Sequence, residues 1–414
     1  MRKIIASLDI GSSSLKLVVG EIVKTKVNVL ACVSTTSRGI KNGFIVNAES
    51  AIESLNELFN KVNDMLGINV TKVIVAVPSL NLECYMALGS TQVKNEERII
   101  TGRDIGNALQ DCVNKTVSPN MQIVSICPVN FVVNDVDKVL NPLGMLADKL
   151  TIKSVIGVIP KKNIMPIVKC LERIGVEVVD TILGSLGDFA EFKNKDMLGN
   201  VGAIINIGAS NTTVSIFNKG ILTSSEAINV GGDTIDNDIS YVYKVSKPDA
   251  LYLKEKLSLA HKNMAQPNES LIVENKSGDQ IKVNQYDISE VCMQRLEEIL
   301  NLAKKQINLL TKREISYIIV TGGVSEFVDF SIILDEVFNH KAKIGNVLQI
   351  GVRDNKYSTA YGLIKYFGSK LRLQNSEFSI FDLEQQEEFS GIHKKISIND
   401  NSILGKLFGY FFDN

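Results

Sequence analysis

Ser7 to Gly20, SLDIGSSSLKLVVG, is a stretch in which an acidic residue and a Gly-Ser run interrupt two apolar segments. Glycine and serine at the tip of such a turn present backbone N–H groups and hydroxyls, which can cradle the oxygens of a bound phosphate. The carboxylate of Asp9 would repel a phosphate, so its expected role is to hold a magnesium ion, directly or through water, that neutralises a triphosphate. The stretch therefore predicts a site for phosphates and magnesium.

The same arrangement returns later in the chain. Val201 to Gly220, VGAIINIGASNTTVSIFNKG, again runs from an apolar strand through a polar residue, Ile-Gly and small hydroxylic residues into a second apolar strand. Tyr317 to Phe327, YIIVTGGVSEF, ends a further apolar strand with Thr-Gly-Gly, where glycines let a ligand approach the backbone. Taken singly, either hairpin is more often just a turn between two strands. Together, the two hairpins predict two similar domains that close on one cleft and hold the phosphates from both sides.

Strand-like and helix-like segments alternate along most of the chain, which is typical of α/β proteins. The first three strands are expected at residues 4–10, 15–23 and 27–33. Residues 48–66 carry apolar side chains at helical spacing and stop at Gly67, a common helix C-cap. Between residues 82 and 159, strands enclose one helix that begins near Thr101, so an inserted α+β subdomain is predicted.

The bulk composition excludes several classes of protein. The 414 residues are 45% hydrophobic and 22% charged with a formal net charge of -1, which is ordinary for a soluble chain of about two to three domains. Because 45 basic residues balance 46 acidic ones, no net charge attracts a nucleic acid, and no nucleic-acid partner is predicted. Six cysteines without a CxxC pair and three scattered histidines predict a reduced, cytosolic protein without a metal cluster.

The last residues, NSILGKLFGYFFDN, are apolar again after a polar stretch. On a helix, six large apolar side chains would form one continuous stripe: Ile403, Leu404, Leu407, Phe408, Phe411 and Phe412. The stripe is too short to cross a bilayer, so insertion at the membrane interface is predicted. The alternative is a helix that docks on the protein's own core, and the polar stretch of about thirty residues before it counts against that alternative.

These motifs resemble those of the actin-like ATPase superfamily, and most closely those of the bacterial FtsA family of cell-division proteins. DIGSSSLKLVVGEI is similar to the first phosphate motif, INIGASNTTVSIF to the second and VTGGVSEF to the adenosine motif, and NVGGDTIDNDIS resembles the turn and helix that follow the second. The inserted subdomain, the segment RGIKNGFIVN and the apolar tail behind a linker favour FtsA over its relatives. The resemblance implies an actin-like, ribonuclease H-like α/β fold of two domains.

The patterns and the resemblance together divide the chain into six parts. They are the N-terminal part of a first actin-like domain (1–81), an inserted FtsA-type subdomain (82–159), a return to the first domain with the crossover to the second (160–200), a second actin-like domain (201–367), a flexible linker (368–400) and an amphipathic membrane-targeting helix (401–414). The linker is predicted from composition, because this stretch turns polar with charges of both signs.

The resemblance also implies which residues contact ATP and its Mg2+. They are Asp9, Gly11, Ser12, Ser13, Lys16, Asn206, Gly208, Ala209, Ser210, Asn211, Gly231, Gly232, Asp233, Lys254, Gly322 and Gly323. Asp9 is the implied ligand of the magnesium ion, directly or through water. Lys16, on the strand after the turn, can equally point to solvent.

Two departures from the family pattern bear on the chemistry. Asn206 stands where the family carries an aspartate, and Ala209–Asn211 with Thr213 replaces its glycine run and following aspartate. The missing carboxylate would help to orient magnesium or the attacking water, so ATP binding is expected while hydrolysis is expected to be weak or absent, and no catalytic residue is assigned. On the adenosine side, Lys254 matches the family's lysine, but Leu251 stands at the position of its glutamate.

The function that the resemblance implies is that of a filament-forming adaptor. Such a protein would tether polymers of the tubulin-like protein FtsZ to the inner face of the cytoplasmic membrane at the division site, as a peripheral membrane protein, and recruit later division proteins. The first alternative is a small-molecule, sugar-type kinase of the same fold, with Asp188 or Asp233 as the general base. The second alternative is a pilus-assembly relative of FtsA. The apolar tail favours the adaptor over both.

Overall fold

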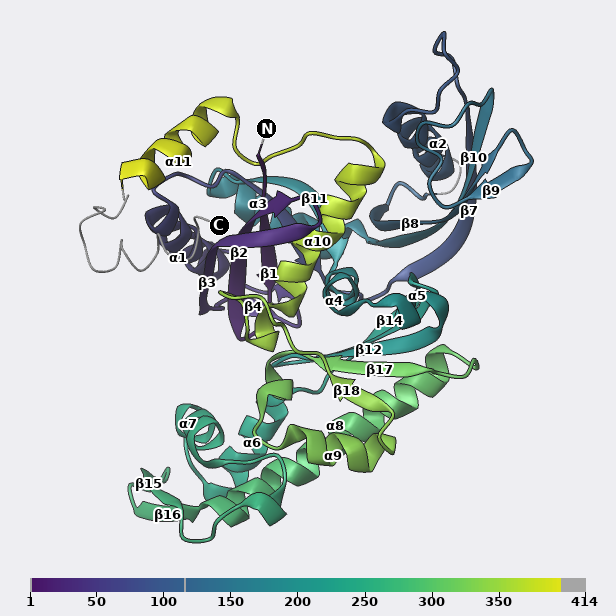
Figure 1. Cartoon of the computed structure of the whole chain (residues 1–414). Helices are drawn as coiled ribbons and strands as arrows, with labels where there is room; N and C mark the ends of the chain where they lie inside the picture. Colours follow the sequence, from purple (N-terminus) through teal and green to yellow (C-terminus); the bar gives the residue numbers. More distant parts are fainter. Residues whose placement is uncertain (1, 115–116, 396–414) are drawn as a thin grey trace, which may run out of the picture.

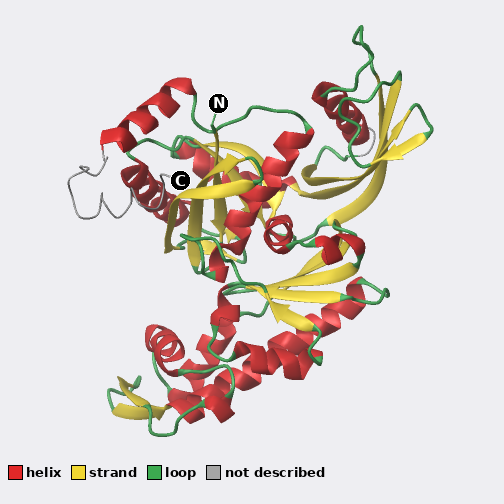
Figure 2. Ribbon diagram, in the orientation of Figure 1, coloured by secondary structure: helices red, strands yellow, loops and turns green. Residues whose placement is uncertain are grey.

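The computed structural model of the chain describes residues 2–114 and 117–395. Two five-stranded sheets form the centres of two domains, and a smaller four-stranded sheet stands to one side of them (Figures 1 and 2). Two helices, α4 (Gly184–Phe192) and α10 (Ser358–Leu373), share one buried apolar cluster with strands of both large sheets. The predicted two-domain α/β architecture is confirmed.

The first large sheet has the strand order β11-β6-β1-β2-β3. Its strands are β1 (Lys3–Ile10), β2 (Ser14–Val23), β3 (Lys26–Thr36), β6 (Lys72–Val77) and β11 (Glu177–Leu183). β1, β2 and β3 run antiparallel, whereas β6 and β11 run parallel to β1. The remaining elements of this domain are β4 (Ile40–Lys41), β5 (Phe44–Ile45), α1 (Ala48–Leu66) and α3 (Met165–Arg173). α1 begins after the Asn47 cap and ends at Gly67 in the left-handed conformation, as its spacing predicted.

The second large sheet has the strand order β14-β13-β12-β17-β18 and repeats the first. Its strands are β12 (Val201–Ile207), β13 (Thr212–Asn218), β14 (Ile221–Ile228), β17 (Tyr317–Thr321) and β18 (Ala342–Ile344). In each sheet, an antiparallel meander of three strands is followed by two strands parallel to the first strand of that meander. Around the second sheet lie α5 (Lys195–Gly199), α6 (Gly232–Tyr243), α7 (Lys247–Leu257), β15 (Ser270–Glu274), β16 (Gln280–Asn284), α8 (Gln285–Leu310) and α9 (Phe330–Phe338).

The inserted α+β subdomain is present as predicted. Its elements are β7 (Glu83–Gln92), α2 (Gly102–Asn114), β8 (Met121–Val133), β9 (Asp137–Val139) and β10 (Lys149–Pro160), with the strand order β7-β10-β8-β9. α2 packs so closely on β7 that a Cβ atom at Gly89 would lie 2.2 Å from the carbonyl oxygen of Ala108. The subdomain has a buried core of its own, which includes Ile105, Phe131 and Ile152.

α4 and α10 cross at two glycines. A Cβ atom at Gly362 would lie 1.9 Å from the carbonyl oxygen of Gly187, so the two backbones can approach this closely only because neither residue has a side chain. α10 also packs on β1 and β2 of the first sheet. The predicted end of the second domain at residue 367 lies inside α10, which packs with strands of both large sheets, so this helix is shared by the two domains. An amphipathic pattern does not say which sheet a helix will cover.

Residues 368–400 are not the flexible linker that their composition predicts, as far as the structure describes them. α10 continues to Leu373, and α11 spans Leu383–Lys395. Between and within these helices, the apolar side chains of Ile380, Phe381 and Phe389 are buried in the core of the first domain. Residues 376–389 therefore form a docked segment, which we call the C-terminal strap. The prediction is wrong here because a few apolar anchors are enough to dock a segment whose average composition is polar.

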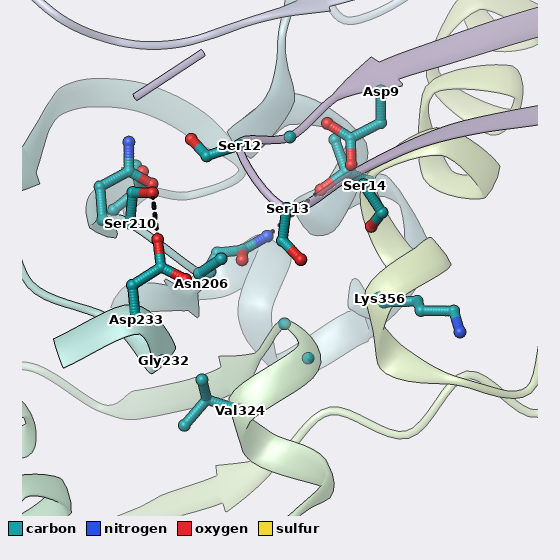
Figure 3. A pocket seen from close by; sticks show the side chains of 18 of the residues that line it. Asp9, Ser12, Ser13, Ser14, Asn206, Ser210, Gly232, Asp233, Val324 and Lys356 are labelled. Atoms are coloured by element: carbon teal, nitrogen blue, oxygen red, sulfur yellow. Dashed lines mark hydrogen bonds between the residues drawn. The ribbon is translucent and has the colours of Figure 1, made fainter. Parts of the chain in front are cut away.

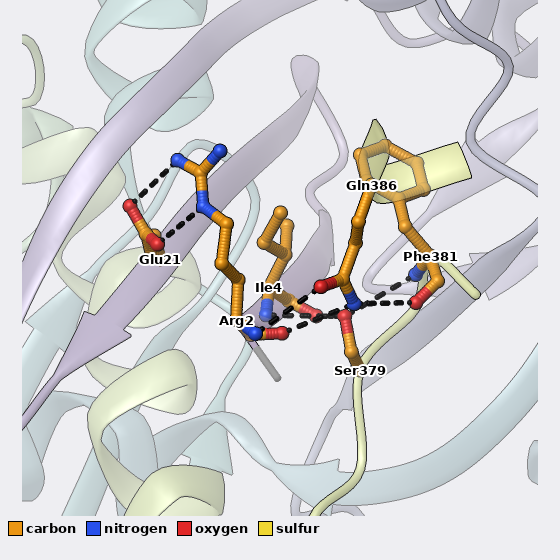
Figure 4. A network of polar contacts seen from close by, with 6 residues as sticks. All are labelled: Arg2, Ile4, Glu21, Ser379, Phe381 and Gln386. Atoms are coloured by element: carbon orange, nitrogen blue, oxygen red, sulfur yellow. Dashed lines mark hydrogen bonds and ion pairs between the residues drawn. The ribbon is translucent and has the colours of Figure 1, made fainter. Parts of the chain in front are cut away.

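The C-terminal strap is held to the first strand by a network of polar contacts (Figure 4). The Ile380 N–H donates to the carbonyl oxygen of Ile4 at 2.9 Å. The backbone N–H of Arg2 donates to Gln386 Oε1 at 3.1 Å, and Gln386 Nε2 donates to the carbonyl oxygens of Arg2 and Phe381. Arg2 and β1 are therefore joined to the C-terminal strap on the first domain.

The predicted membrane-targeting helix, residues 401–414 with its stripe from Ile403 to Phe412, lies outside the described residues. Within residues 2–114 and 117–395, no helix has the length and apolar character needed to cross a membrane.

Candidate functional site

Both glycine hairpins and the Thr-Gly-Gly turn line a single cavity of about 640 Å³ between the two domains. Figure 3 shows Asp9, Ser12 and Ser13 on one side of it, with Ser210 and Asp233 facing them from the other. Of the residues predicted to contact a nucleotide, all except Gly231 line this cavity. The structure thus brings together segments from the two domains, as the repeated hairpin predicted.

The first hairpin joins β1 to β2 and is closed by the Gly11 N–H, which donates to the carbonyl oxygen of Ser14 at 3.2 Å. Asp9 and Lys16 are direct cross-strand partners, and their side chains form an ion pair with 3.1 Å between Nζ and Oδ2. The Lys16 side chain is only 12% exposed. Lys16 therefore lines the cavity and does not take the alternative orientation toward solvent.

The second hairpin joins β12 to β13 and packs against the start of α6. The N–H groups of Gly232 and Asp233 donate to the carbonyl oxygens of Gly208 and Ala209 at 3.0 and 2.8 Å. Ser210 Oγ donates to Asp233 Oδ2 at 2.6 Å. Gly231 lies behind this hairpin, where a Cβ atom would be 2.5 Å from the Gly208 carbonyl oxygen. Its role in the structure is close packing, and it does not face the cavity.

The floor of the cavity is a buried polar network around Asp188, which is 2% exposed. Asn206 Nδ2 donates to Asp188 Oδ2 at 2.7 Å, and Asp188 Oδ1 accepts from the hydroxyls of Ser358 at 2.7 Å and Thr359 at 2.9 Å. Asn206 Nδ2 also donates to Thr359 Oγ1 at 3.2 Å, and Thr321 Oγ1 donates to Ser358 Oγ at 3.1 Å. Burial raises the pKa of Asp188 to about 6, and the nearby charge of Asp9 also raises it.

The raised pKa of Asp188 gives a prediction for stability against pH. Because its folded pKa of about 6 exceeds the ordinary 3.8, the folded state binds this proton more tightly than the unfolded state. The contribution of Asp188 to the free energy of unfolding is expected to fall by up to roughly 3 kcal/mol as pH rises from about 4 to about 6, and then to level off. Urea unfolding of wild type and Asp188→Asn from pH 4 to 8 measures this directly. Parallel profiles of the two proteins would contradict the prediction.

The cavity also contains charged residues that were not predicted: Asp236, Asp354 and Lys356. Asp236 pairs with the predicted Lys254 at 2.6 Å, and Asp354 pairs with Lys356 at 3.0 Å. Burial raises the pKa of Asp236, and the Lys254 charge opposes that shift. The hydroxyls of Ser358 and Thr359 at the start of α10 were also missed. The Ser-Thr pair in this part of the sequence was the available signal, but it is equally typical of an ordinary helix start.

The lining of the cavity offers two kinds of chemistry. The backbone N–H groups and hydroxyls of the two hairpins suit phosphate oxygens. The apolar side chains of Leu251, Val324, Phe327 and Val328 also line the cavity and suit a flat ring. Within the described chain, no three histidine, cysteine or carboxylate side chains converge as a metal site. Magnesium would fit at Asp9 only with ligand phosphates as its further partners, which is how proteins commonly bind it.

Comparison with protein families gives two matches on this chain. The family model described as "Cell division protein FtsA" matches residues 203–362, and the model described as "SHS2 domain inserted in FTSA" matches residues 81–157. Cell division protein FtsA of Bacillus subtilis is 27% identical over 89% of this chain and 84% of its own length. The corresponding protein of Borreliella burgdorferi is 24% identical over 99% of this chain and 98% of its own length.

Solved structures share the fold at low sequence identity. A chain of a PilM-PilN type IV pilus biogenesis complex superposes with a TM-score of 0.59 and 12% identity, covering 88% of this chain and 98% of that one. An MreB of Spiroplasma citri bound to ADP superposes with a TM-score of 0.56 and 15% identity, covering 90% of this chain and 99% of that one. At this identity the likeness concerns the fold, which is actin-like.

Proposed function

Because the chain belongs to the FtsA family of cell-division proteins, we propose that it is a nucleotide-binding adaptor that tethers FtsZ polymers to the cytoplasmic membrane. It would act at the division site, on the inner face of the membrane, as a peripheral protein that forms filaments and recruits later division proteins. The observation that carries the nucleotide part is the closure of two glycine hairpins on one cavity. An MreB with the same fold is described as bound to ADP, which supports the same class of ligand here.

ATP with Mg2+ is the ligand that the cavity suits best. Asp9 would hold the magnesium ion, whose charge neutralises the phosphates, and the N–H groups and hydroxyls of both hairpins would bind the phosphate oxygens. Hydrolysis is proposed to be weak or absent, because the carboxylates nearest the hairpins are engaged. Asp9 is paired with Lys16, Asp188 accepts three hydrogen bonds, and Asp233 accepts one from Ser210. A general base must also reach the proton that it removes, and these three carboxylates are held by protein groups instead.

The two alternative functions gain no support from the site. A kinase would need Asp188 or Asp233 to face a substrate hydroxyl, but Asp188 is buried and Asp233 is bonded to the hairpin. The likeness to a PilM chain is one of fold at 12% identity, whereas the inserted subdomain matches the model for the FtsA insertion.

Binding of a fluorescent ATP analogue tests the nucleotide part. With magnesium, Asp9→Ala is expected to weaken binding by about tenfold or more, because the phosphates lose the anchored cation. In EDTA the same substitution is not expected to weaken binding, because it removes a negative charge beside the phosphates. The matched control is Asp137→Ala on exposed β9, which should bind as wild type does. Equal affinities of wild type and Asp9→Ala in magnesium would contradict the role of Asp9.

The membrane part depends on the tail, residues 401–414, which lies outside the described residues. The described chain ends with α11, whose residues Gln385 and Glu388 lie beside the end of α1 (Figure 1). Insertion would come from the apolar stripe, since Lys406 is the single basic residue within residues 401–414. Filament formation would then link many weakly binding tails, because linked tails stay bound to a membrane longer than a single tail does.

Co-sedimentation with phosphatidylcholine vesicles tests the membrane part. A chain that ends at Asp400 is expected to stay in the supernatant. In the full chain, Phe411→Asp on the apolar stripe should reduce membrane partition by about tenfold or more, because one buried aromatic contributes roughly 1.5–3 kcal/mol. Tyr410→Asp adds the same charge to the other side of the helix and should have a much smaller effect. Purified FtsZ should pellet with the vesicles only when the full chain is present; equal pelleting of the truncated chain would reject the tail as the anchor.

A further inference from the structure

The side chains of Asp188 and Asn206 are hydrogen-bonded to each other where the two domains meet. Asp188 belongs to α4, whereas Asn206 is the second-last residue of β12, directly before the second hairpin. Their side chains meet at 2.7 Å, and Thr359 on α10 contacts both of them. One carboxylate thus connects the strand that carries a phosphate hairpin to both helices that cross between the domains.

We propose that Asp188 is a positioning residue of the nucleotide site, which orients the amide of Asn206 and ties the second hairpin to the crossing of α4 and α10. The pair works with one carboxylate and one amide, and either position can carry either group. The proposal rests on the nucleotide binding proposed above, and it assigns to Asp188 a role in that site other than proton transfer.

Neighbouring groups fix the orientation of the Asn206 amide at both its NH2 group and its oxygen. Both hydrogens of Nδ2 are used, one toward Asp188 and the other toward Thr359. The amide oxygen faces the Thr-Gly-Gly turn, where a Cβ atom at Gly322 would lie 2.6 Å from it. Gly322 also has a φ of +95°, a conformation that favours glycine. Asn206 is therefore held between α4 on one side and the turn after β17 on the other.

The charges around the pair explain why it contains only one carboxylate. From β1, Asp9 faces Asp188 closely enough for its charge to raise the Asp188 pKa, and Lys16 on β2 is paired with Asp9. In the described chain, the groups from β12 and α10 that donate hydrogen bonds to Asp188 are a neutral amide and two neutral hydroxyls. A carboxylate at position 206 would meet Asp188 at hydrogen-bond distance with no donor between them. Two such groups repel each other when both are ionised, so they would share a proton that is lost only at a raised pH.

Exchange of the two groups tests the proposal. Asn206→Asp places two carboxylates together, and Asp188→Asn with Asn206→Asp restores one amide and one carboxylate in reversed order. In the exchanged protein, the amide oxygen at position 188 can accept from the hydroxyls of Ser358 and Thr359, and its NH2 group can donate to position 206. The comparison variant is Asn211→Asp, which adds the same charge to the same hairpin at a residue that, in the described chain, is not among the hydrogen-bond donors to Asp188.

The readout is the affinity for fluorescent ADP with magnesium, as a ratio to wild type at each pH from 5.5 to 8.5, beside the melting temperature without ligand. Asn206→Asp is expected to bind about tenfold or more weakly at pH 8.5 and to approach wild type at pH 5.5, where the shared proton is bound. The exchanged protein should stay within about threefold of wild type throughout, which corresponds to less than 1 kcal/mol. The ratio for Asn211→Asp should not change with pH, because its added carboxylate titrates at a normal, lower pKa.

Three results would overturn the proposal. The first is that Asn206→Asp binds nucleotide as tightly as wild type at pH 8.5, and the second is that its affinity ratio to wild type does not change with pH. The third is that the exchanged protein binds nucleotide as weakly as Asn206→Asp does. If Asn206→Asp does not fold at pH 8.5, the exchanged protein decides, since folding and binding by it support the proposal and failure of either overturns it. If wild type binds no nucleotide, the proposed function fails as well. If wild type binds and the pH effect is absent, only the role of Asp188 fails.

Discussion

Phe381→Ala is expected to lower the free energy of unfolding of the first domain by about 3–5 kcal/mol, the usual cost of removing a buried phenyl ring. Phe381 is 1% exposed and packs in the same apolar cluster as β1 and α1, although it lies in a stretch of polar composition. The loss would include the transfer of the ring to water and a cavity that the strap cannot fill. Urea unfolding of the full chain measures the change.

Leu383→Ala is the matched control for this prediction. Leu383 lies two residues further along the strap but is 61% exposed, so its truncation should change the free energy of unfolding by less than about 0.5 kcal/mol. A flexible linker would make both substitutions neutral. Equal, small effects of the two would therefore contradict the docked strap.

Gly362→Ala is expected to destabilise the protein by about 3 kcal/mol, at the upper end of the cost of overpacking. The new methyl group would lie 1.9 Å from the carbonyl oxygen of Gly187, so α4 and α10 would have to move apart. Thr359 is three residues before Gly362 on α10, and its contacts to the floor of the cavity would change with that movement. A weaker affinity for nucleotide should therefore accompany the loss of stability.

Gly106→Ala on α2 is the control, because it makes the same change inside a helix. A Cβ atom at Gly106 would have no neighbour within 4 Å, so alanine there should stabilise the protein by about 0.5–1 kcal/mol through helix propensity. The two variants are compared by their urea unfolding midpoints and slopes. A Gly362→Ala protein as stable as wild type would show that the helices can separate without cost.

The local patterns predicted well those features that depend on neighbours in sequence. The helix that ends at Gly67 follows from apolar spacing and a left-handed cap, and the two hairpins follow from glycine turns between apolar strands. The repeat of Asp9-Ile10-Gly11 as Asn206-Ile207-Gly208 predicted two similar domains, and the two large sheets have matching strand orders. Each of these features is encoded within a short window of the chain, so a single sequence is enough to find it.

The sequence by itself therefore determined the two hairpins, the inserted subdomain and the hairpin residues that face the cavity, because backbone conformation and periodicity are local. Only the tertiary structure decided how Lys16 points, where Gly231 packs, which helix covers the first sheet, and that the C-terminal strap docks on β1. It also decided the environment of Asp188, whose partners at positions 206, 358 and 359 come from β12 and α10. Burial and hydrogen bonding depend on which distant segments meet in space, and no local pattern contains that information.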